Sequence, residues 1–235
     1  MIIAAYPSAI LGVFVAVDGG TSSPLTHLGV TALLASLPLI IIACTSFIKI
    51  ALVLAILRSG LGAPGVPPSS VLTVLAAVLS MFVMAPVGAE IIEALELATS
   101  TGAAAVANDP LGFSEARALY DAASPPLLDF LRHNAAPSEV EYFNDLLGSS
   151  AGAEHGFRVL VPAFTVGEIT EAFLIGFLVF LPFLVIDLIV ANTLLALGMH
   201  MLSPTAISLP LKLLLFISVD GWHVLLSGLL VNYST

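Results

Sequence analysis

The sequence predicts an all-α membrane protein, with four long apolar helical segments that form two hairpins around a helical acidic insertion. Apolar residues make up 59% of its 235 residues and charged residues only 9%, with a mean hydropathy of +1.10. Soluble domains are nearer to half apolar and a quarter charged. Each segment also exceeds the about 20 residues that cross a bilayer as a helix. The segments are Leu28–Leu57, Val71–Ile92, Ala172–Leu202 and Thr205–Val231.

The N-terminal segment, residues 1–27, has a short apolar stretch at Ile10–Val17 with no Lys or Arg before it. A secretory signal requires a basic region at that place. Two alternatives stay open here, a cleaved signal and an amphipathic helix that lies on the membrane surface.

The first apolar hairpin is predicted over residues 28–92. Pro38 and Pro86 interrupt its two segments, and proline removes a backbone hydrogen bond, so these helices are expected to have protein neighbours. The turn-rich linker Arg58–Pro68 follows Lys49 and begins with an arginine. Since positive charge favours the cytoplasmic side, the linker is predicted to be cytoplasmic.

An acidic region is predicted over residues 93–167, on the extracytoplasmic side. Thirteen of the sixteen acidic residues lie between Glu90 and Glu171, which excludes a nucleic-acid partner because phosphates require a basic surface. Short helices are expected at residues 113–120, 127–132 and 139–147, with a loop at 101–108. Ser114 and Ser138 are the expected N-caps, and the Pro125-Pro126 pair is expected to separate the first two helices.

The second apolar hairpin is predicted over residues 168–235, with its turn at Ser203-Pro204 on the cytoplasmic side. Its third and fourth apolar segments contain Pro182 and Pro210. Met199 and Met201 flank His200 just before the turn. Methionine suits an irregular or changing gap, so this motif is either a seal or the end of an ordinary helix.

Ionisable residues inside apolar segments are costly and normally face a protein interior. They are interpreted first as buried ion pairs that fix the helix register and second as a proton or ion relay. With the turn at Ser203-Pro204, Lys212 has no carboxylate at its own depth in the hairpin. Its partner is then expected on another subunit, Glu168 in preference to Asp187, so a charge swap with Glu168 should restore assembly. The residues in question are Lys49, Glu168, Asp187, Lys212 and Asp220.

Motifs for common chemistry are absent from the sequence. It contains no HExxH, no GxxxxGK[ST] and no GxSxG, and Cys44 is its single cysteine. We therefore expect no enzyme activity, no cofactor, no metal site and no disulfide within the chain.

Several stretches between about Leu37 and Asn232 form a recognisable series: Cys44–Lys49, Leu57–Gly62 with Pro67-Pro68, Met81–Pro86, Pro162–Phe164, Gly176–Asp187, Leu209–Phe216 and Val219–Trp222. Together they resemble the family of type III secretion export-apparatus proteins known as SctR in injectisomes and FliP in flagella.

The resemblance implies a pore-forming subunit of a protein-export gate in the bacterial inner membrane. Family members form homo-oligomers that include the smaller S and T subunits (flagellar Q and R), contact other export-gate proteins and extend to the periplasmic side. They pass unfolded secreted proteins. A methionine-rich ring narrows the channel, which places the pore constriction at Met199, His200 and Met201.

The chain departs from the family at two places. His200 stands where a third methionine is usual, so the constriction is expected to be more polar and sensitive to mildly acidic pH. The linker lacks the usual Gln pair and Asn, which weakens any inferred cytoplasmic contact there. Lys49 and Ala85–Gly88 favour the injectisome branch over the flagellar one. The alternative function is an ion-coupled transporter of small solutes.

Overall fold

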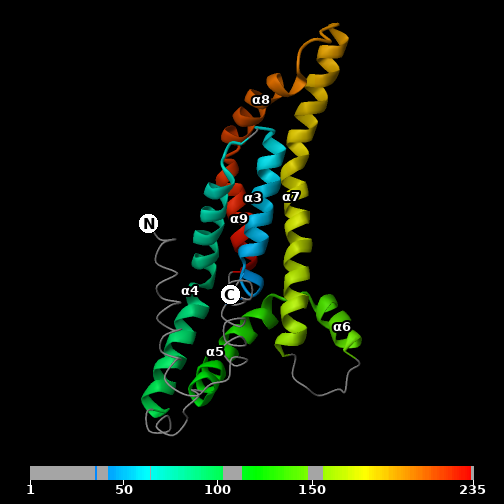
Figure 1. Cartoon of the computed structure of the whole chain (residues 1–235). Coiled ribbons are helices and arrows are strands. Elements are labelled where there is room, and N and C mark those ends of the chain that lie inside the picture. The colour runs from blue at the N-terminus through cyan, green and yellow to red at the C-terminus, as the bar shows by residue number, and fades with distance from the viewer. Residues whose placement is uncertain (1–34, 36–41, 64, 103–112, 148–155, 234–235) are drawn as a thin grey trace.

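The computed structural model describes residues 35, 42–63, 65–102, 113–147 and 156–233. Within these ranges the chain forms seven α-helices and one short 3₁₀ helix, and no strand. Figure 1 shows an elongated bundle in which the longest helix, α7, runs along most of the molecule, while α4 and α5 extend beyond its lower end. The predicted all-α class is confirmed for the described residues.

Helices α3 (Phe47–Leu61) and α4 (Ser69–Gly102) form the first hairpin. Helix α3 ends at Gly62, whose φ of 71° is a left-handed conformation that glycine adopts without strain. Near the other end of α3, the Ser46 hydroxyl donates to Ser80 of α4 at 3.2 Å inside the core. Helix α4 continues through Pro86 and past Ile92, so the second apolar segment and the start of the acidic region share one helix.

The acidic region contains helices α5 (Phe113–Asn134) and α6 (Pro137–Leu146). The expected break at Pro125-Pro126 is wrong, because both prolines lie inside α5. Leu127, Leu128 and Leu131, which follow this pair, pack against α7, and such packing compensates for the lost backbone hydrogen bonds. The expected N-caps are wrong too: Ser114 lies inside α5, and Ala136 precedes α6. The loop expected at 101–108 lies mostly outside the described residues.

Helix α7 (Phe157–Ala196) has 40 residues, about 60 Å at the usual rise, with Pro162 and Pro182 in its interior. The chain then turns back into helix α8 (Pro204–Ser218) and helix α9 (Gly221–Leu230), and ends in the 3₁₀ helix η3 (Val231–Tyr233). In Figure 1, α7 extends well beyond the α3–α4 linker, and α8 returns from that far end.

The expectation of four membrane-spanning helices is met only in part. Among the described residues, α4 and α7 are long and apolar enough to cross a membrane, and α8 with α9 makes a third span if that bent pair is counted as one. The two helices of the pair meet at 63°. Residues 28–34 and 36–41 of the first apolar segment lie outside the described residues, and its last part belongs to the 15-residue α3.

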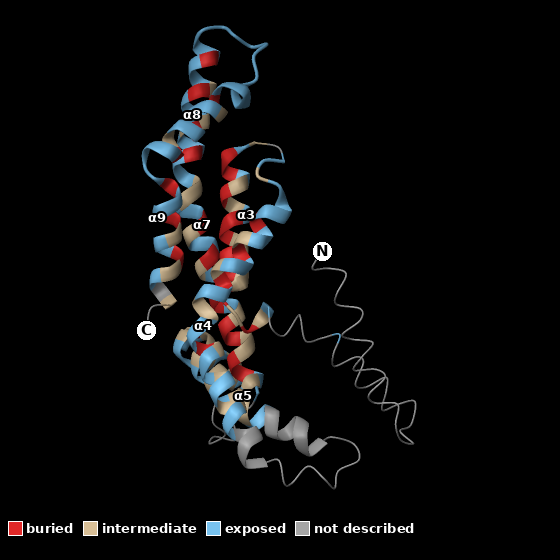
Figure 2. Ribbon diagram, turned by 90° about the vertical axis from the view of Figure 1, so that its left-hand side faces the viewer, coloured by how far each residue is buried: buried red, intermediate tan, exposed pale blue. Residues whose placement is uncertain are grey.

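Two apolar clusters form the core. The larger one surrounds α3, which packs against α7, α4 and α8, and it also takes in leucines of α9. The smaller one joins α5 to the start of α7 around Leu131, Leu160 and Phe164, and also covers Cys44. Figure 2 shows buried residues concentrated on α3 and the inner face of α7, with exposed residues along the outer faces. Many of those exposed side chains on α4, α7 and α8 are themselves large and apolar.

Candidate functional site: two buried lysine clusters and an exposed turn

The first cluster surrounds Lys49, which lies on α3 and is 1% exposed. Its Nζ atom is 3.0 Å from Glu168 Oε1 and 2.7 Å from Glu171 Oε2, both on α7. Glu168 is buried as well, whereas the Glu171 side chain is 47% exposed. A buried ammonium group requires compensating charge, and these two carboxylates supply it. The cluster therefore fixes the position of α3 along α7.

Tyr233, in η3, completes the Lys49 cluster from the C-terminal end of the described chain. Its hydroxyl donates to Glu168 Oε2, and its ring centroid lies 4.3 Å from Lys49 Nζ, a cation–π distance. The ring also stacks on Phe130 of α5, with centroids 6.3 Å apart. Burial and the adjacent Glu168 carboxylate raise the pKa of the Tyr233 phenol above its ordinary value. The phenol is therefore a hydrogen-bond donor at physiological pH.

The second cluster surrounds Lys212 of α8, which is 3% exposed. Its Nζ atom lies 2.6 Å from Asp187 Oδ2 on α7 and 2.9 Å from the carbonyl oxygen of Gly60 on α3. The Gly60 carbonyl is in the last turn of α3, where helix carbonyls have no partner within the helix and carry partial negative charge. One ammonium group thus binds three helices together.

The hairpin register expected from the sequence is wrong. Because α7 ends at Ala196 and α8 begins at Pro204, the turn is centred before Ser203-Pro204, and this brings Lys212 level with Asp187. The claim that Lys212 has no carboxylate at its own depth is therefore wrong. Glu168, the preferred partner on another subunit, binds Lys49 within the chain.

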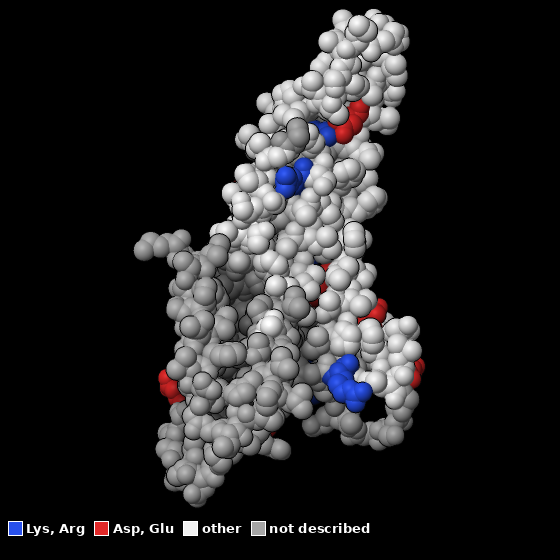
Figure 3. Space-filling view, viewed as in Figure 1, with Lys and Arg blue, Asp and Glu red and all other residues white. Residues whose placement is uncertain are grey.

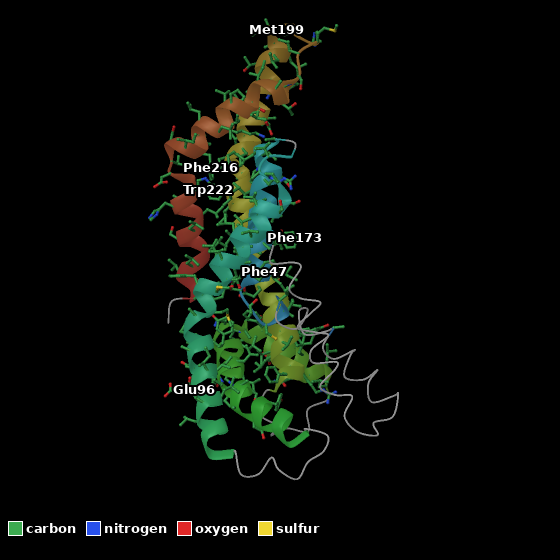
Figure 4. All side chains as sticks on the ribbon, turned by 60° about the vertical axis from the view of Figure 1, so that its left-hand side comes forward. Phe47, Glu96, Phe173, Met199, Phe216 and Trp222 are labelled. Carbon is green, nitrogen blue, oxygen red and sulfur yellow. The ribbon has the colours of Figure 1, made fainter. Side chains whose placement is uncertain are left out.

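The predicted constriction residues lie in the turn between α7 and α8. Met199 is 47% exposed and Met201 is fully exposed at 100%, and His200 between them is exposed. Gly198, with φ of 70°, reverses the chain, and the Met199 N–H bonds to Leu194 O at 2.9 Å. Figure 4 shows Met199 at one extreme of the molecule and Glu96 toward the other. The turn therefore projects both thioethers and the imidazole away from the core.

Asp220 is not brought to either lysine cluster. It occupies the N-cap position of α9 with φ of 50°, but its side chain makes no capping hydrogen bond and is exposed. Instead Asp220 forms the outer corner where α8 and α9 meet.

A groove that the sequence argument missed lies between α3, α4, their linker and the start of α8. Its volume is about 700 Å³, and small residues spaced four apart on α3 make its floor. That spacing, Ala51, Ala55 and Ser59, is the sequence signal that predicts a shallow helix face. Arg58, Gly62 and Thr73 also line the groove. Figure 3 shows few charged groups on this part of the surface.

Comparisons with known proteins identify the relatives of the chain. The model of the FliP family matches residues 30–229. The virulence protein YscR of Salmonella typhimurium is 41% identical over 220 residues, which is 90% of this chain and 98% of the relative. The Yop proteins translocation protein R of Yersinia pestis is 41% identical over 211 residues, 87% of this chain and 94% of the relative. The flagellar biosynthetic protein FliP of Cereibacter sphaeroides is 40% identical over 222 residues, 92% of this chain and 70% of the relative.

Proposed function

The chain belongs to the FliP family, and on that basis we propose that it is a structural, pore-forming subunit of a bacterial type III secretion export gate. In this role it passes unfolded protein substrates across the inner membrane and performs no catalysis. The observation that carries the proposal is the match over residues 30–229, together with 41% identity that covers almost the whole of a virulence relative.

The proposed assembly contains several copies of this chain, the small S and T subunits and other export-gate proteins, in contact with lipid and extending to the periplasmic side. The exposed apolar surface of the single chain supports this. Phe173, Leu178 and Ile217 are 57%, 59% and 76% exposed, and more such residues follow along α7 and α8. Contiguous apolar surface of this kind marks contact with lipid or with other subunits.

Within that assembly, the turn at Met199, His200 and Met201 is the proposed constriction. Its support is the projection of these side chains beyond the core, where several copies bring their thioethers together. Flexible methionine side chains fill the channel when no substrate is present, and they move aside when an unfolded chain passes. Lys49, Glu168, Asp187 and Lys212 hold the helices that carry the turn.

An injectisome is the proposed setting in preference to a flagellum. The support is Lys49 and the Ala85–Gly88 stretch.

The test is native mass spectrometry of the full chain purified in mild detergent, with and without the two small subunits co-expressed. We expect a multi-copy complex that incorporates both small subunits. A monomer or dimer indifferent to them would contradict the proposal. Solute-dependent proton uptake by that monomer would favour the transporter instead.

A further inference from the structure

Arg58 is the cation of the groove, and it has no carboxylate partner. Lys49 and Lys212 are both paired within the chain at 2.6 to 3.0 Å, whereas Arg58 forms no ion pair with any residue that the structure describes. It is partly buried in the groove wall beside small residues. A guanidinium group in such apolar surroundings is most stable with an anion bound to it.

Arg58 is the one charged side chain among the residues that line the groove. The Ser59 hydroxyl already donates to Ala55 O at 3.0 Å, and the Thr73 hydroxyl to Ser69 O at 2.9 Å. A carboxylate matches the two parallel N–H groups of a guanidinium, so Arg58 can hold one carboxylate in a bidentate pair.

An unpaired carboxylate stands on another face of the same molecule. Asp220 forms no ion pair and no capping bond within the described ranges, and it lies at the 63° corner between α8 and α9. Apolar side chains surround it: Ile217 is 76% exposed, Val219 is 52% exposed and Trp222 is 43% exposed. Trp222 is held edge-on against Phe216 at 5.4 Å. The corner is thus a rigid apolar projection with one negative charge.

The groove and the Asp220 corner lie at a similar level along the long axis of the bundle. A side chain at Gly60, two residues after Arg58, would touch Phe183 at 2.9 Å. Phe183 in turn packs on Phe216, four residues before Asp220, with centroids 6.4 Å apart. The two unpaired charges therefore lie at similar depth, on α3 and at the α8–α9 corner. Figure 4 shows Phe216 and Trp222 together on the α8–α9 side.

We propose that the Asp220 corner of one copy docks into the groove of a second copy, where the Asp220 carboxylate pairs with Arg58. Trp222 fills the space above the small residues of α3. This contact joins two different surfaces, so each copy offers a free groove and a free corner to the next, which generates a ring or a helix. The inference rests on the proposed multi-copy assembly and specifies one of its contacts.

The test is charge reversal in the full chain co-expressed with the small subunits. Arg58→Glu and Asp220→Lys are made singly and together, and the yield of assembled complex is measured by native mass spectrometry. Each single change is expected to lower the yield about tenfold or more, because reversing one charge of the pair places two like charges opposite each other in the interface. The double change is expected to restore it. Arg132→Glu is the control, since Arg132 pairs with Asp129 on the exposed face of α5.

A cross-link reports the contact without charge reversal. Cys44 is the single native cysteine, so Ser59→Cys with His223→Cys in a Cys44→Ala background gives two defined thiols. Both positions are exposed, one in the groove and one beside the corner. We expect ladders of covalently linked copies. Ser59→Cys with Tyr142→Cys, on α6, is expected to give none.

The outcomes separate this contact from the proposed function. An assembled complex that tolerates both single reversals and forms no ladder overturns the contact and leaves the export-gate proposal standing. Failure of the wild-type chain to assemble overturns both. Loss of bound phospholipid in Arg58→Gln, with copy number unchanged, also overturns the contact and assigns the groove to lipid.

Discussion

Lys212 Nζ lies 2.6 Å from Asp187 Oδ2, and this contact fixes α8 against α7. The same ammonium group also donates to the Gly60 carbonyl oxygen at 2.9 Å, so α3 is held at the same point. Asp187 Oδ1 is buried with no hydrogen-bond partner among the described residues. Most of the electrostatic attraction between Lys212 and Asp187 therefore comes from the one short contact between Nζ and Oδ2.

Lys212→Met is expected to destabilise the chain by about 2 to 4 kcal/mol, because it leaves an Asp187 carboxylate and a helix-terminal carbonyl without their partner. The measurement is thermal unfolding in detergent. Lys212→Met with Asp187→Asn is expected to recover part of the loss. Arg132→Ala, which breaks an exposed pair, should cost under about 1 kcal/mol. An equal loss in both single variants would contradict this prediction.

Lys49→Met is expected to cost more, about 3 to 5 kcal/mol, because Glu168 is left charged and buried. The second substitution Glu168→Gln should offset much of that cost by removing the unpaired charge. A shift of roughly 2 to 4 °C in melting temperature accompanies each kcal/mol in a chain of this size. A double variant less stable than Lys49→Met would show that the pair is not the cause.

Gly176→Ala is expected to disturb the packing of α3 against α7. An added Cβ would clash with Ile56 Cδ1 and lie 3.1 Å from Ile56 Cγ2 and 3.2 Å from Ile56 Cβ, so Ile56 must repack and give by a few tenths of an ångström. The expected cost is about 1 to 3 kcal/mol, and the second change Ile56→Ala should relieve the clash. Gly88→Ala on α4 is the matched control. No atom lies within 4 Å of its added Cβ, so helix propensity should make it neutral or slightly stabilising.

Tyr233 is expected to stabilise the folded chain at neutral pH and to lose that contribution at high pH. Its phenol has a raised pKa in the folded chain, so its contribution is complete below the ordinary phenol pKa of about 10 and is lost as pH rises above it. Tyr233→Phe should be less stable than wild type at neutral pH and lose less stability in alkali. Unfolding midpoints compared from neutral pH upward test this. A constant difference between the two proteins would contradict it.

His200→Met is expected to make secretion through the assembled complex less sensitive to mildly acidic pH. Protonation of an imidazole adds charge to the proposed constriction, and a thioether has no such change. Secretion and ion leak are measured in cells across mildly acidic pH, with Met199→Leu as a control that keeps His200. Identical pH profiles for wild type and His200→Met would remove this role.

Composition and hydropathy predicted the helical class because helices are the economical way to satisfy backbone groups in an apolar chain. The ends of helices and the partners of individual residues were harder to predict from the sequence. The prolines at 125 and 126 did not end α5, since packing of Leu131 and its neighbours on α7 overrides local propensity. The Lys212 register failed because the turn begins after Ala196 and not at Ser203. Tyr233 was missed because a single terminal aromatic residue has no periodic pattern.

The groove was missed for a different reason. Alanine and serine four residues apart are common in apolar helices, and they indicate a shallow face without saying what approaches it. Only the arrangement of α3, α4 and α8 turns that face into a groove with Arg58 in its wall.

The length of α7 beyond its anchor has a mechanical consequence. From Asp187 to the end of α7 at Ala196 the helix rises about 14 Å, and every residue from Leu195 to Ile207 is exposed. The turn is thus the unsupported end of the α7–α8 hairpin, which the Lys212–Asp187 salt bridge holds in place. A tilt of a few degrees about that salt bridge moves Met201 by an ångström or more, so a small displacement at the salt bridge becomes a larger displacement at the turn.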